Sequence, residues 1–527
     1  MGEKKSKVRS LVHGGVLVPP YEFKGLHILY RGKRVDLNPL QEEMAVAFGR
    51  HLLAGRGEDR VFVRNFLSDF SEALGLPKDT ELEHFDFSPV LDWLNREKKR
   101  KEEMTKEERK RLAEERKRLR EANRERWGTA WINGERIEVK NYTVEPPCVF
   151  VGRGKHPQRG RWKPRVEYED IILNLSPEAP MPEAPEGRKW GGREWDPGAL
   201  WIAKWRDKLT GKMKYVWLSD SSPLKQEREK EKFDQARELG RKIERVREHI
   251  RRGLSDPDPK RRMVATVCYL IDELKLRVGD ERDREERNTV GATTLGPEHI
   301  RFDGGRVRFS FLGKDHVRWS KSLEPIPEVL RNLKEFASRG EERIFPGVSS
   351  EDVNSFLGEA MPGLTAKVFR TYHASKIVEE ELKRRRVGKE STEMEKKYVA
   401  KMANLRAAEE LNHKRKVPAG WRKKVERMRE RIRVLEQRIA ELRAKPGKRT
   451  EERVKKLKER IRELRLRLEL EREIRDFNLG TSLNSYIDPR IYASWAKRVG
   501  CGVEKIYSKS LLKKFSWAVG HDGQAQA

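Results

Sequence analysis

The longest regular pattern of apolar positions lies between residues 425 and 468, where they recur every three or four residues among Arg, Lys and Glu. Pro446 and Gly447 divide the pattern into two series. Its apolar positions are Val425, Met428, Ile432, Leu435, Ile439 and Leu442, then Val454, Leu457, Ile461, Leu464 and Leu468. A stripe with this spacing is buried against a second helix of the same kind. The pattern therefore predicts an antiparallel coiled-coil hairpin.

Three further stretches have the period of a helix. Residues 61–74 are typical of an amphipathic helix, and residues 261–276 are apolar enough for a core helix that ends at Arg277. A long helix is predicted between them, with one face formed by Phe233, Ala236, Leu239, Ile243, Val246 and Ile250. Residues 96–126 are almost wholly Lys, Arg and Glu, which predicts solvated helices with a break near Thr105.

Alternating apolar and polar residues predict three β-hairpins. One covers residues 30–35, and a second pairs residues 201–205 with 213–217. The third runs from Val307 to Trp319 and places Lys314 at its tip. Four prolines between residues 177 and 185 predict a stiff connector and a domain boundary. For 527 residues, these elements indicate an α+β chain of several domains.

Near the end of the chain, Asp488 and Pro489 form the start signal of a helix predicted over residues 489–497. Ile487 can pack onto Tyr492 of that helix. Tyr486 is then expected on a turn just outside the helix, with its hydroxyl free to face a partner. A single tyrosine in this position is usually a packing residue, so its meaning depends on the rest of the chain.

Composition narrows the possible partners. Lys and Arg number 117 against 86 Asp and Glu, and the net charge of +31 favours a polyanion, most often nucleic acid. Three distant cysteines argue against a disulfide framework and favour a reducing compartment. The longest apolar run, residues 263–271, is far shorter than the roughly 20 residues of a membrane span. The basic N-terminus lacks the apolar stretch of a secretory signal, so we expect a soluble intracellular protein.

Several charged residues are candidates whose ordinary structural roles remain open. Residues 152–165 carry six Lys or Arg and one His, which suits either phosphate neutralisation or a flexible basic loop. Arg277 can simply complement a helix end, and Lys314 can be an idle hairpin tip. Lys367 and Arg370 lie three residues apart at a helix start. His413 ends an Ala-rich helical segment, where a histidine is more often a cap than a catalyst.

In chain order, Arg277, Lys314, Arg370 and His413 precede Tyr486, which is the residue set of a tyrosine-nucleophile DNA strand transferase. With the motifs around them, the chain resembles the type IB DNA topoisomerases of the eukaryotic-like group, from about residue 14 nearly to the C-terminus. The motifs are Leu276-Arg277-Val278-Gly279, Thr289-Val290-Gly291, Phe311-Leu312-Gly313-Lys314-Asp315, residues 363–372, Asn412-His413, Leu479-Gly480-Thr481-Ser482 and Tyr486-Ile487-Asp488-Pro489-Arg490. Pro146-Pro147, Phe150, Gly152-Arg153-Gly154 and His156-Pro157 extend the likeness.

The resemblance implies a bilobed DNA clamp with a mainly helical catalytic domain of the tyrosine recombinase and topoisomerase IB type. Its parts are an N-terminal clamp half over residues 1–200, a catalytic core over 201–415, a coiled-coil linker over 416–475 and a C-terminal domain over 476–527. The expected partner is double-stranded DNA, without a membrane, and the expected state is a monomer.

The resemblance also implies an activity and roles for single residues. Tyr486 would cleave one strand of supercoiled DNA and keep a 3′-phosphotyrosine while the DNA turns. Arg277, Arg370 and His413 would stabilise the phosphate oxygens, and Lys314 would protonate the leaving 5′-oxygen. The DNA contacts expected by the same likeness are Arg153, Lys155, Asp315, Lys367 and Thr481.

No cofactor is expected. No Gly-Lys pair is followed by Ser or Thr, so a nucleotide-binding P-loop is absent from the sequence, and so are paired metal-ligand motifs for zinc. Relaxation is therefore expected to run without ATP or metal.

Two alternatives remain: a tyrosine recombinase or integrase, and a non-catalytic architectural DNA clamp. Ser485 and Asp280 stand where eukaryotic members carry asparagine, which leaves sensitivity to the family's drug camptothecin open. Few cysteines and Arg/Glu-rich helices suggest an archaeal origin, with a cytoplasmic, nucleoid-associated rather than nuclear location.

Overall fold

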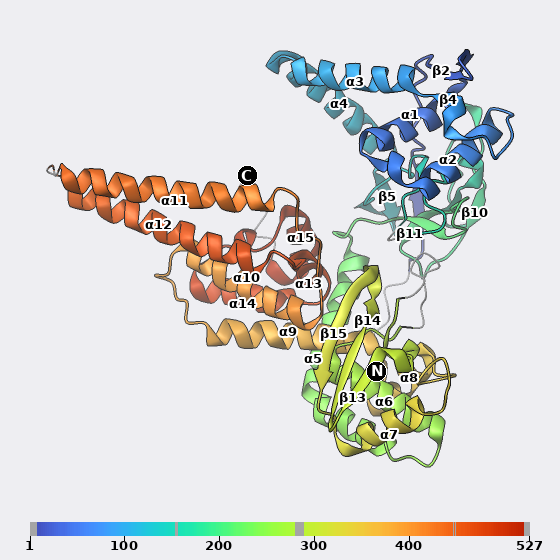
Figure 1. Cartoon of the computed structure of the whole chain (residues 1–527). Helices are drawn as coiled ribbons and strands as arrows, with labels where there is room; N and C mark the ends of the chain where they lie inside the picture. The colour runs from blue at the N-terminus through green and yellow to red at the C-terminus, as the bar shows by residue number, and fades with distance from the viewer. Residues whose placement is uncertain (1–7, 153–155, 280–288, 446, 448, 521–527) are drawn as a thin grey trace. The chain divides into compact units, whose positions relative to one another are not determined.

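The computed structural model describes residues 8–152, 156–279, 289–445, 447 and 449–520, except for the side chains of Glu186 and Asp315 (Figure 1). The chain forms two compact units, Met1–Lys225 and Gln226–Ala527. Each unit is described by itself below. None of the described helices is both long enough and apolar enough to cross a bilayer.

The first unit begins with a small helix-on-sheet core. Its sheet has the order β3-β2-β4, with β2 at His27–Tyr30, β3 at Lys33–Asp36 and β4 at Phe85–Asp86. The sheet is covered by α1 (Pro39–Leu53), α2 (Arg60–Ala73) and α3 (Ser88–Glu103). Phenylalanines fill the interior, and the rings of Phe48 and Phe66 stack with centroids 3.9 Å apart. The predicted hairpin at residues 30–35 and the helix at 61–74 are confirmed.

The predicted break in the charged helices is also confirmed. Helix α3 ends at Glu103, and α4 covers Lys106–Trp127. Thr105 lies between them because its side chain accepts a hydrogen bond from the backbone of Glu108, whose carboxylate bonds back to the Thr105 backbone. Most of α4 is exposed, as its charge pattern requires.

Two further sheets complete the first unit around a second core. One has the order β1-β5-β6, with strands Leu11–His13, Thr129–Ile132 and Glu135–Glu138. The other has the order β10-β9-β11-β12, with strands Gly192–Glu194, Ile172–Asn174, Trp201–Arg206 and Met213–Trp217. A short pair, β7 (Cys148–Val149) and β8 (Trp162–Lys163), joins the first core.

The position of the boundary differs from the prediction at residue 200. The hairpin of β11 and β12 is present as predicted, but β11 also pairs with β9, so the sheet continues across residue 200. The prolines of residues 177–185 lie within the first unit, between β9 and β10. The unit therefore extends to Lys225 because strands on both sides of the prolines share one sheet.

From Gln226 onward, α5 (Pro223–Gly253) belongs to the second unit, and its predicted apolar face is buried. It packs with α6 (Pro259–Leu274), α7 (Pro327–Ala337) and α8 (Ser350–Ala360) in one core. The sheet of this core has the order β13-β14-β15, with strands Ile300–Asp303, Arg306–Gly313 and Val317–Leu323. Gly313 pairs with Val317, so Lys314 lies at the hairpin tip as predicted.

A second core of this unit is entirely helical. It contains α9 (Ala366–Arg384), α10 (Glu393–Glu410), α13 (Leu479–Ser485), α14 (Pro489–Val499), α15 (Lys509–Lys514) and α16 (Ser516–Val519). Helix α14 confirms the predicted start at Pro489 and ends at Val499, with Gly500 in the left-handed conformation at φ 62°.

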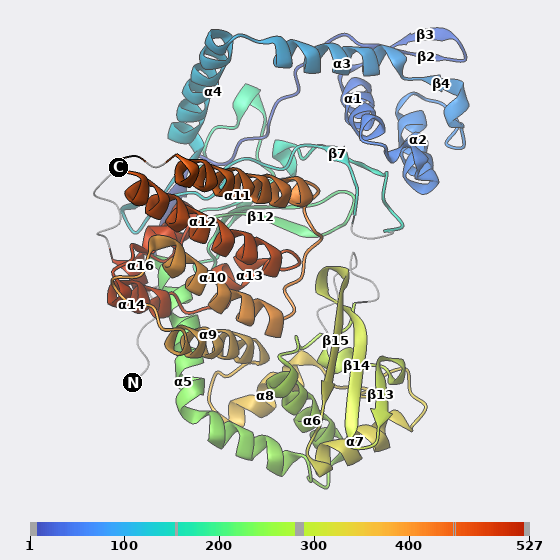
Figure 2. The ribbon, with the colours of Figure 1, turned by 60° about the vertical axis from the view of Figure 1, so that its left-hand side comes forward.

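Helices α11 (Trp421–Ala444) and α12 (Thr450–Glu473) lie side by side in both ribbon views (Figures 1 and 2). Their apolar stripes meet in a narrow cluster that buries Ile432, Ile439, Val454, Ile461 and Leu464. At the base of the pair, Leu470 packs against Met402 and Leu405 of α10. Further along, α12 contacts α10 through the ion pair of Arg462 with Glu395 at 2.7 Å, so the half of the pair nearest its base is anchored to the helical core.

Candidate active site

Tyr486 lies on a tight turn between two helices of the second unit. Its backbone N–H donates to the Ser482 carbonyl oxygen of α13 at 2.9 Å, and Asp488 caps α14 by accepting from the Arg490 N–H at 3.0 Å. Ser375 of α9 joins the two sides, because its hydroxyl donates to the Tyr486 carbonyl oxygen at 3.3 Å and accepts from the Asp488 N–H at 3.0 Å. The backbone on either side of Tyr486 is therefore fixed.

Three of the predicted residues gather around the phenol, which is only 6% exposed. Arg277 Nη1 donates to the Tyr486 hydroxyl at 3.1 Å. The Arg370 guanidinium carbon lies 5.1 Å from the centre of the Tyr486 ring, and the His413 ring centre lies 5.3 Å from it. Side chains from three distant segments thus surround the Tyr486 side chain.

Arg277 reaches this position because the chain turns sharply after α6. Lys275 ends the helix with a φ of 58°, and the Arg277 carbonyl oxygen then accepts from the Ala292 N–H at 2.9 Å. Gly279 passes so close to Gly291 that a Cβ on Gly279 would lie 2.5 Å from the Gly291 Cα. A glycine is required at this crossing.

Arg370 is buried in the first turns of α9, with 4% of the residue exposed. It donates to the backbone carbonyl oxygens of Lys275 and Leu411, the latter at 3.1 Å, and to His413 Nε2 at 3.2 Å. Burial, and then the charge of Arg277, lowers the pKa of Arg370 to about 10, which leaves it cationic at neutral pH. Among the described residues, no carboxylate forms an ion pair with Arg277 or Arg370, so both cations are available to an anion.

His413 is neutral and its tautomer follows from its partners. Burial, and then the charges of Arg370 and Arg277, lowers the pKa of His413 to about 3. A guanidinium only donates, so His413 Nε2 accepts from Arg370. Nδ1 then carries the hydrogen and donates to Ser482 Oγ at 2.6 Å. Ser482 is fully buried on α13 and is a partner that the sequence motifs did not single out for a role.

Lys314 lines a cavity of about 130 Å³ whose wall also includes Arg277, Arg370 and His413. Strands β14 and β15 hold it there at their tip, where the side chain is exposed. Thr481 of α13 lines the same cavity, as do Asn412, Lys414 and Asn478. The cavity therefore brings four of the five predicted catalytic residues together beside the Tyr486 hydroxyl.

The remaining predicted DNA contacts are placed differently. Lys367 is exposed on the first turn of α9 and does not line the cavity, whereas Arg370, one turn later, is buried. Arg153 and Lys155 lie outside the described residues, as does the side chain of Asp315. Asp280 also lies outside them. The DNA contacts of these residues stay predictions.

The pKa of Tyr486 lies below its ordinary value of 10.0. Burial acts to raise it, but the charges of Arg370 and Arg277 outweigh burial. The site thus offers a tetrahedral anion a small cavity lined by four Lys or Arg side chains, next to a phenol whose oxygen is easier to deprotonate. In the described part of the chain, no three His, Cys, Asp or Glu side chains gather as metal ligands.

Family models cover nearly the whole chain. The eukaryotic DNA topoisomerase I catalytic core matches residues 221–446, which include Arg277, Lys314, Arg370 and His413. The DNA binding fragment of the same enzymes matches residues 6–218, and the C-terminal topoisomerase domain matches residues 458–524, which include Tyr486.

Curated relatives agree with the family models. DNA topoisomerase 1 beta of Arabidopsis thaliana is 34% identical over 550 residues, covering 99% of this chain and 59% of the relative. DNA topoisomerase 1 of Candidozyma auris is 36% identical over 447 residues, covering 82% of this chain and 59% of the relative. DNA topoisomerase 1 of Homo sapiens is 32% identical over 551 residues, covering 97% of this chain and 71% of the relative. The chain spans 59% of the length of the first two and belongs to the eukaryotic DNA topoisomerase I family.

Proposed function

We propose that the protein relaxes supercoiled double-stranded DNA as a type IB topoisomerase. The observation that carries this proposal is the Tyr486 hydroxyl, held at 3.1 Å by Arg277 beside a cavity lined by cations. The relatives named DNA topoisomerase 1 support the same reaction.

In the cleavage step, the Tyr486 oxygen attacks the phosphorus of one phosphodiester and the bond from phosphorus to the 5′-oxygen breaks. The phenol proton passes to the solvent, and the departing 5′-oxygen gains a proton from Lys314, which lines the cavity and stays a neutral amine until resealing returns that proton. The product is a 3′-phosphotyrosine and a free 5′-hydroxyl. Reversal of the same steps reseals the strand, and because the phosphotyrosine conserves the bond, no ATP is needed.

Arg277 and Arg370 stabilise the charge that develops on the two non-bridging oxygens. Arg370 is already held by two backbone carbonyl groups, so it does not need to reorganise when the phosphate enters. His413 Nε2 accepts from Arg370 in the free site and must become a donor to reach a phosphate oxygen. Nδ1 would then accept from the Ser482 hydroxyl, which can reverse its direction.

At larger scale, we propose that the two units act as the halves of a clamp around the duplex. Helices α11 and α12 serve as the coiled-coil linker, and their exposed Lys and Arg side chains slow the turning DNA electrostatically. One chain supplies every residue of the site, which supports action as a monomer. A relaxation rate proportional to protein concentration, rather than to its square, would agree with this.

The direct test is Tyr486→Phe, which removes only the attacking oxygen. We expect plasmid relaxation to fall by a factor of about 1,000 or more, with DNA affinity retained. Mass spectrometry of complexes trapped in denaturant should place the DNA on Tyr486 in the parent protein.

The same experiment separates the alternatives. An architectural clamp would bind DNA equally well in both forms and never give a covalent adduct. A recombinase would give the adduct but would require a recognition site and paired protomers. Relaxation of any plasmid by dilute protein would exclude a recombinase.

A further inference from the structure

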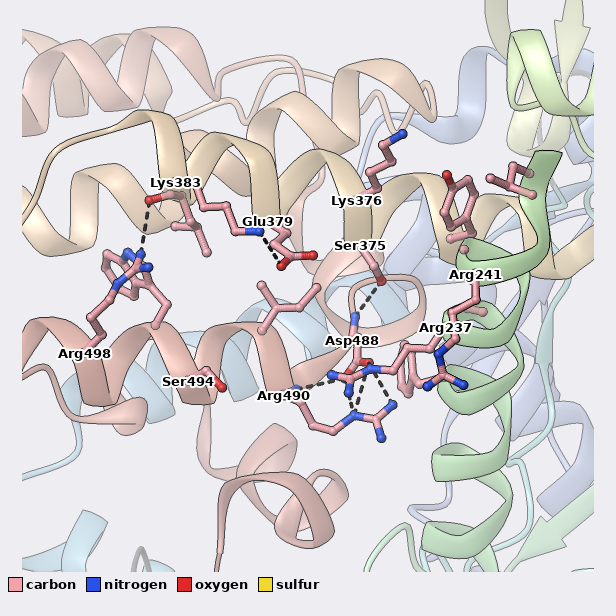
Figure 3. Close-up of a pocket in the computed structure, with 18 residues that line it drawn as sticks. Arg237, Arg241, Ser375, Lys376, Glu379, Lys383, Asp488, Arg490, Ser494 and Arg498 are labelled. Atoms are coloured by element: carbon pink, nitrogen blue, oxygen red, sulfur yellow. Dashed lines mark hydrogen bonds and ion pairs between the residues drawn. The ribbon is translucent and has the colours of Figure 1, made fainter.

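A second, larger pocket lies beside the turn that carries Tyr486, because Ser375 and Asp488, which form hydrogen bonds of that turn, both line it (Figure 3). It is a groove of about 740 Å³ between α9 and α14, with α5 at one end, and it shares no lining residue with the active-site cavity. Six of its lining side chains are cationic and two are carboxylates, a formal excess of four positive charges. The cations are Arg237 and Arg241 of α5, Lys376 and Lys383 of α9, and Arg490 and Arg498 of α14, and the carboxylates are Glu379 and Asp488.

The floor of the groove is apolar. Phe233, Tyr372 and Trp495 line it, and all three are buried or nearly so. Charges next to such a surface are screened less by water than charges on an open face. An anion that enters the groove therefore interacts more strongly with its cations than it would elsewhere on the protein.

The arginines of the groove differ in the partners that they already have. Arg237 Nε donates to Asp488 at 2.7 Å, and Arg490 Nη1 donates to Asp234 at 2.6 Å while its other nitrogens bond Asp488. By contrast, Arg241 forms no ion pair within the described residues. Among the same described residues, Arg498 donates one hydrogen bond, to the Leu382 carbonyl oxygen at 3.5 Å. Two guanidinium groups thus remain for an external anion.

The cations follow the length of the groove. Figure 3 shows Arg241 of α5 at one end and Arg498 of α14 at the other, with Lys376 of α9 and Arg490 of α14 between them. A row of cations of this kind fits a ligand with several negative charges better than a single anion. Guanidinium groups bind phosphate oxygens through paired hydrogen bonds, which a single-charged anion would use only in part.

We propose that this groove binds a small oligophosphate, a molecule with two or more linked phosphate groups, and that its occupation slows DNA cleavage. The groove reaches the nucleophile because Asp488 and Ser375 both line it and both hold the Tyr486 turn. Bound phosphate competes with Asp488 for Arg237 and Arg490 and so loosens that turn. The effect on cleavage rests on the proposed function, whereas binding itself does not.

Binding is tested by calorimetry with sodium tripolyphosphate and the full chain, without DNA and at constant ionic strength. We expect one site per chain, and at least about tenfold weaker binding in Arg241→Gln/Arg498→Gln. The matched control is Arg301→Gln/Arg331→Gln, which removes the same charge from exposed positions on β13 and α7. Equal losses in both double variants, or a dissociation constant of the parent protein weaker than about 1 mM, would overturn the proposal.

The effect on cleavage is tested by single-turnover reaction on an oligonucleotide duplex. Saturating tripolyphosphate should slow adduct formation in the parent protein and the control pair, but not in Arg241→Gln/Arg498→Gln. Equal slowing in all three would mean that tripolyphosphate acts at the DNA surface, and the groove would have no regulatory role. Failure of the proposed function would appear separately, as no adduct even without tripolyphosphate.

Discussion

At the scale of single residues, the site depends on cations that no described carboxylate neutralises. Against the effect of burial, Arg370 and Arg277 lower the pKa of Tyr486, and burial together with the same two cations holds His413 neutral. These residues were predicted from the resemblance of the spaced motifs to the topoisomerase IB family, since each one alone has an ordinary structural role at a helix end or hairpin tip. Ser482 and Ser375 were not predicted, since serine is common and both act only through contacts between distant segments.

The lowered pKa of Tyr486 predicts how the rate of cleavage depends on pH. Cleavage should rise with pH as the phenol loses its proton, and cations that lower the pKa move this rise to lower pH. Arg277→Gln removes one cation, so the rise should move to higher pH. Arg277→Lys keeps the charge and should leave its position closer to that of the parent protein. Single-turnover rates across pH would contradict this account if both variants shifted alike.

Ser482 is expected to be a positioning residue for His413. Without its hydroxyl, Nδ1 of His413 loses its 2.6 Å partner, which takes the Nδ1 hydrogen bond in the free site and must donate to Nδ1 when Nε2 becomes the donor. Ser482→Ala should slow cleavage about tenfold without weakening DNA binding, and Ser482→Thr should restore most of the rate. Nitrogen-15 NMR of histidine reports the tautomer directly. An unchanged His413 signal in Ser482→Ala would rule out this role.

At the scale of elements, apolar periodicity predicted several long helices and a long hairpin, and it missed the short helices and strands. Helices α2, α5 and α6 and the hairpin of β14 and β15 were predicted because burial imposes a period on many residues, whereas α14 was predicted from the start signal of Asp488 and Pro489. Helix α13 was not, since Gly, Thr, Ser and Asn are weak helix formers. It is held instead by contacts from elsewhere, among them the Asn404 amide on the Leu479 carbonyl oxygen at 3.1 Å. Strands β9 and β10 have three residues each, too few for a pattern.

The role of the paired helices α11 and α12 can be tested without damaging the core. Removing residues 432–463 and joining the ends with a short glycine-rich turn keeps the base, where Leu470 packs on α10. We expect about twofold faster rotation in each cleavage event and a smaller dependence on salt. Single-molecule relaxation of supercoiled DNA measures both.

A control separates charge from length. Changing the exposed Arg429, Arg431, Lys455 and Lys458 to Gln keeps the helices but removes four charges. If the exposed charges of α11 and α12 slow the turning of the DNA, this variant should behave like the shortened one. An unchanged rotation rate and salt response in both would end the proposed role.

At the scale of the whole molecule, the net positive charge and the presence of several domains could be predicted from the sequence, but the position of the domain boundary could not. A proline-rich stretch usually marks a connector, and here it lies within a sheet whose strands pair across it. Pairing of distant strands leaves no local signal. The first unit also contains a buried histidine, His13, whose neighbours could not be predicted either.

His13 should make the first unit sensitive to acid. Its Nδ1 accepts from the Gly15 N–H at 3.1 Å and its Nε2 donates to the Asn174 carbonyl oxygen at 3.0 Å, while burial lowers its pKa to about 4. The unfolded chain takes up a proton near pH 6.5 and the folded unit does not, so stability falls as pH drops from 6.5 towards 4. At pH 5 the loss amounts to about 2 kcal/mol. Thermal unfolding of His13→Gln should show a smaller fall between pH 7 and 5 than the parent protein.

The hydroxyl of Ser375 has a mechanical consequence. It ties the peptide of Tyr486 to α9, the helix that also carries Arg370. During the proposed swivel, the 3′ end stays bonded to Tyr486 while the duplex with the free 5′-hydroxyl turns, and any pull on the bonded end is borne by that helix. Nucleophile and cation are then displaced together, so the broken end stays in register with the groups that reseal it.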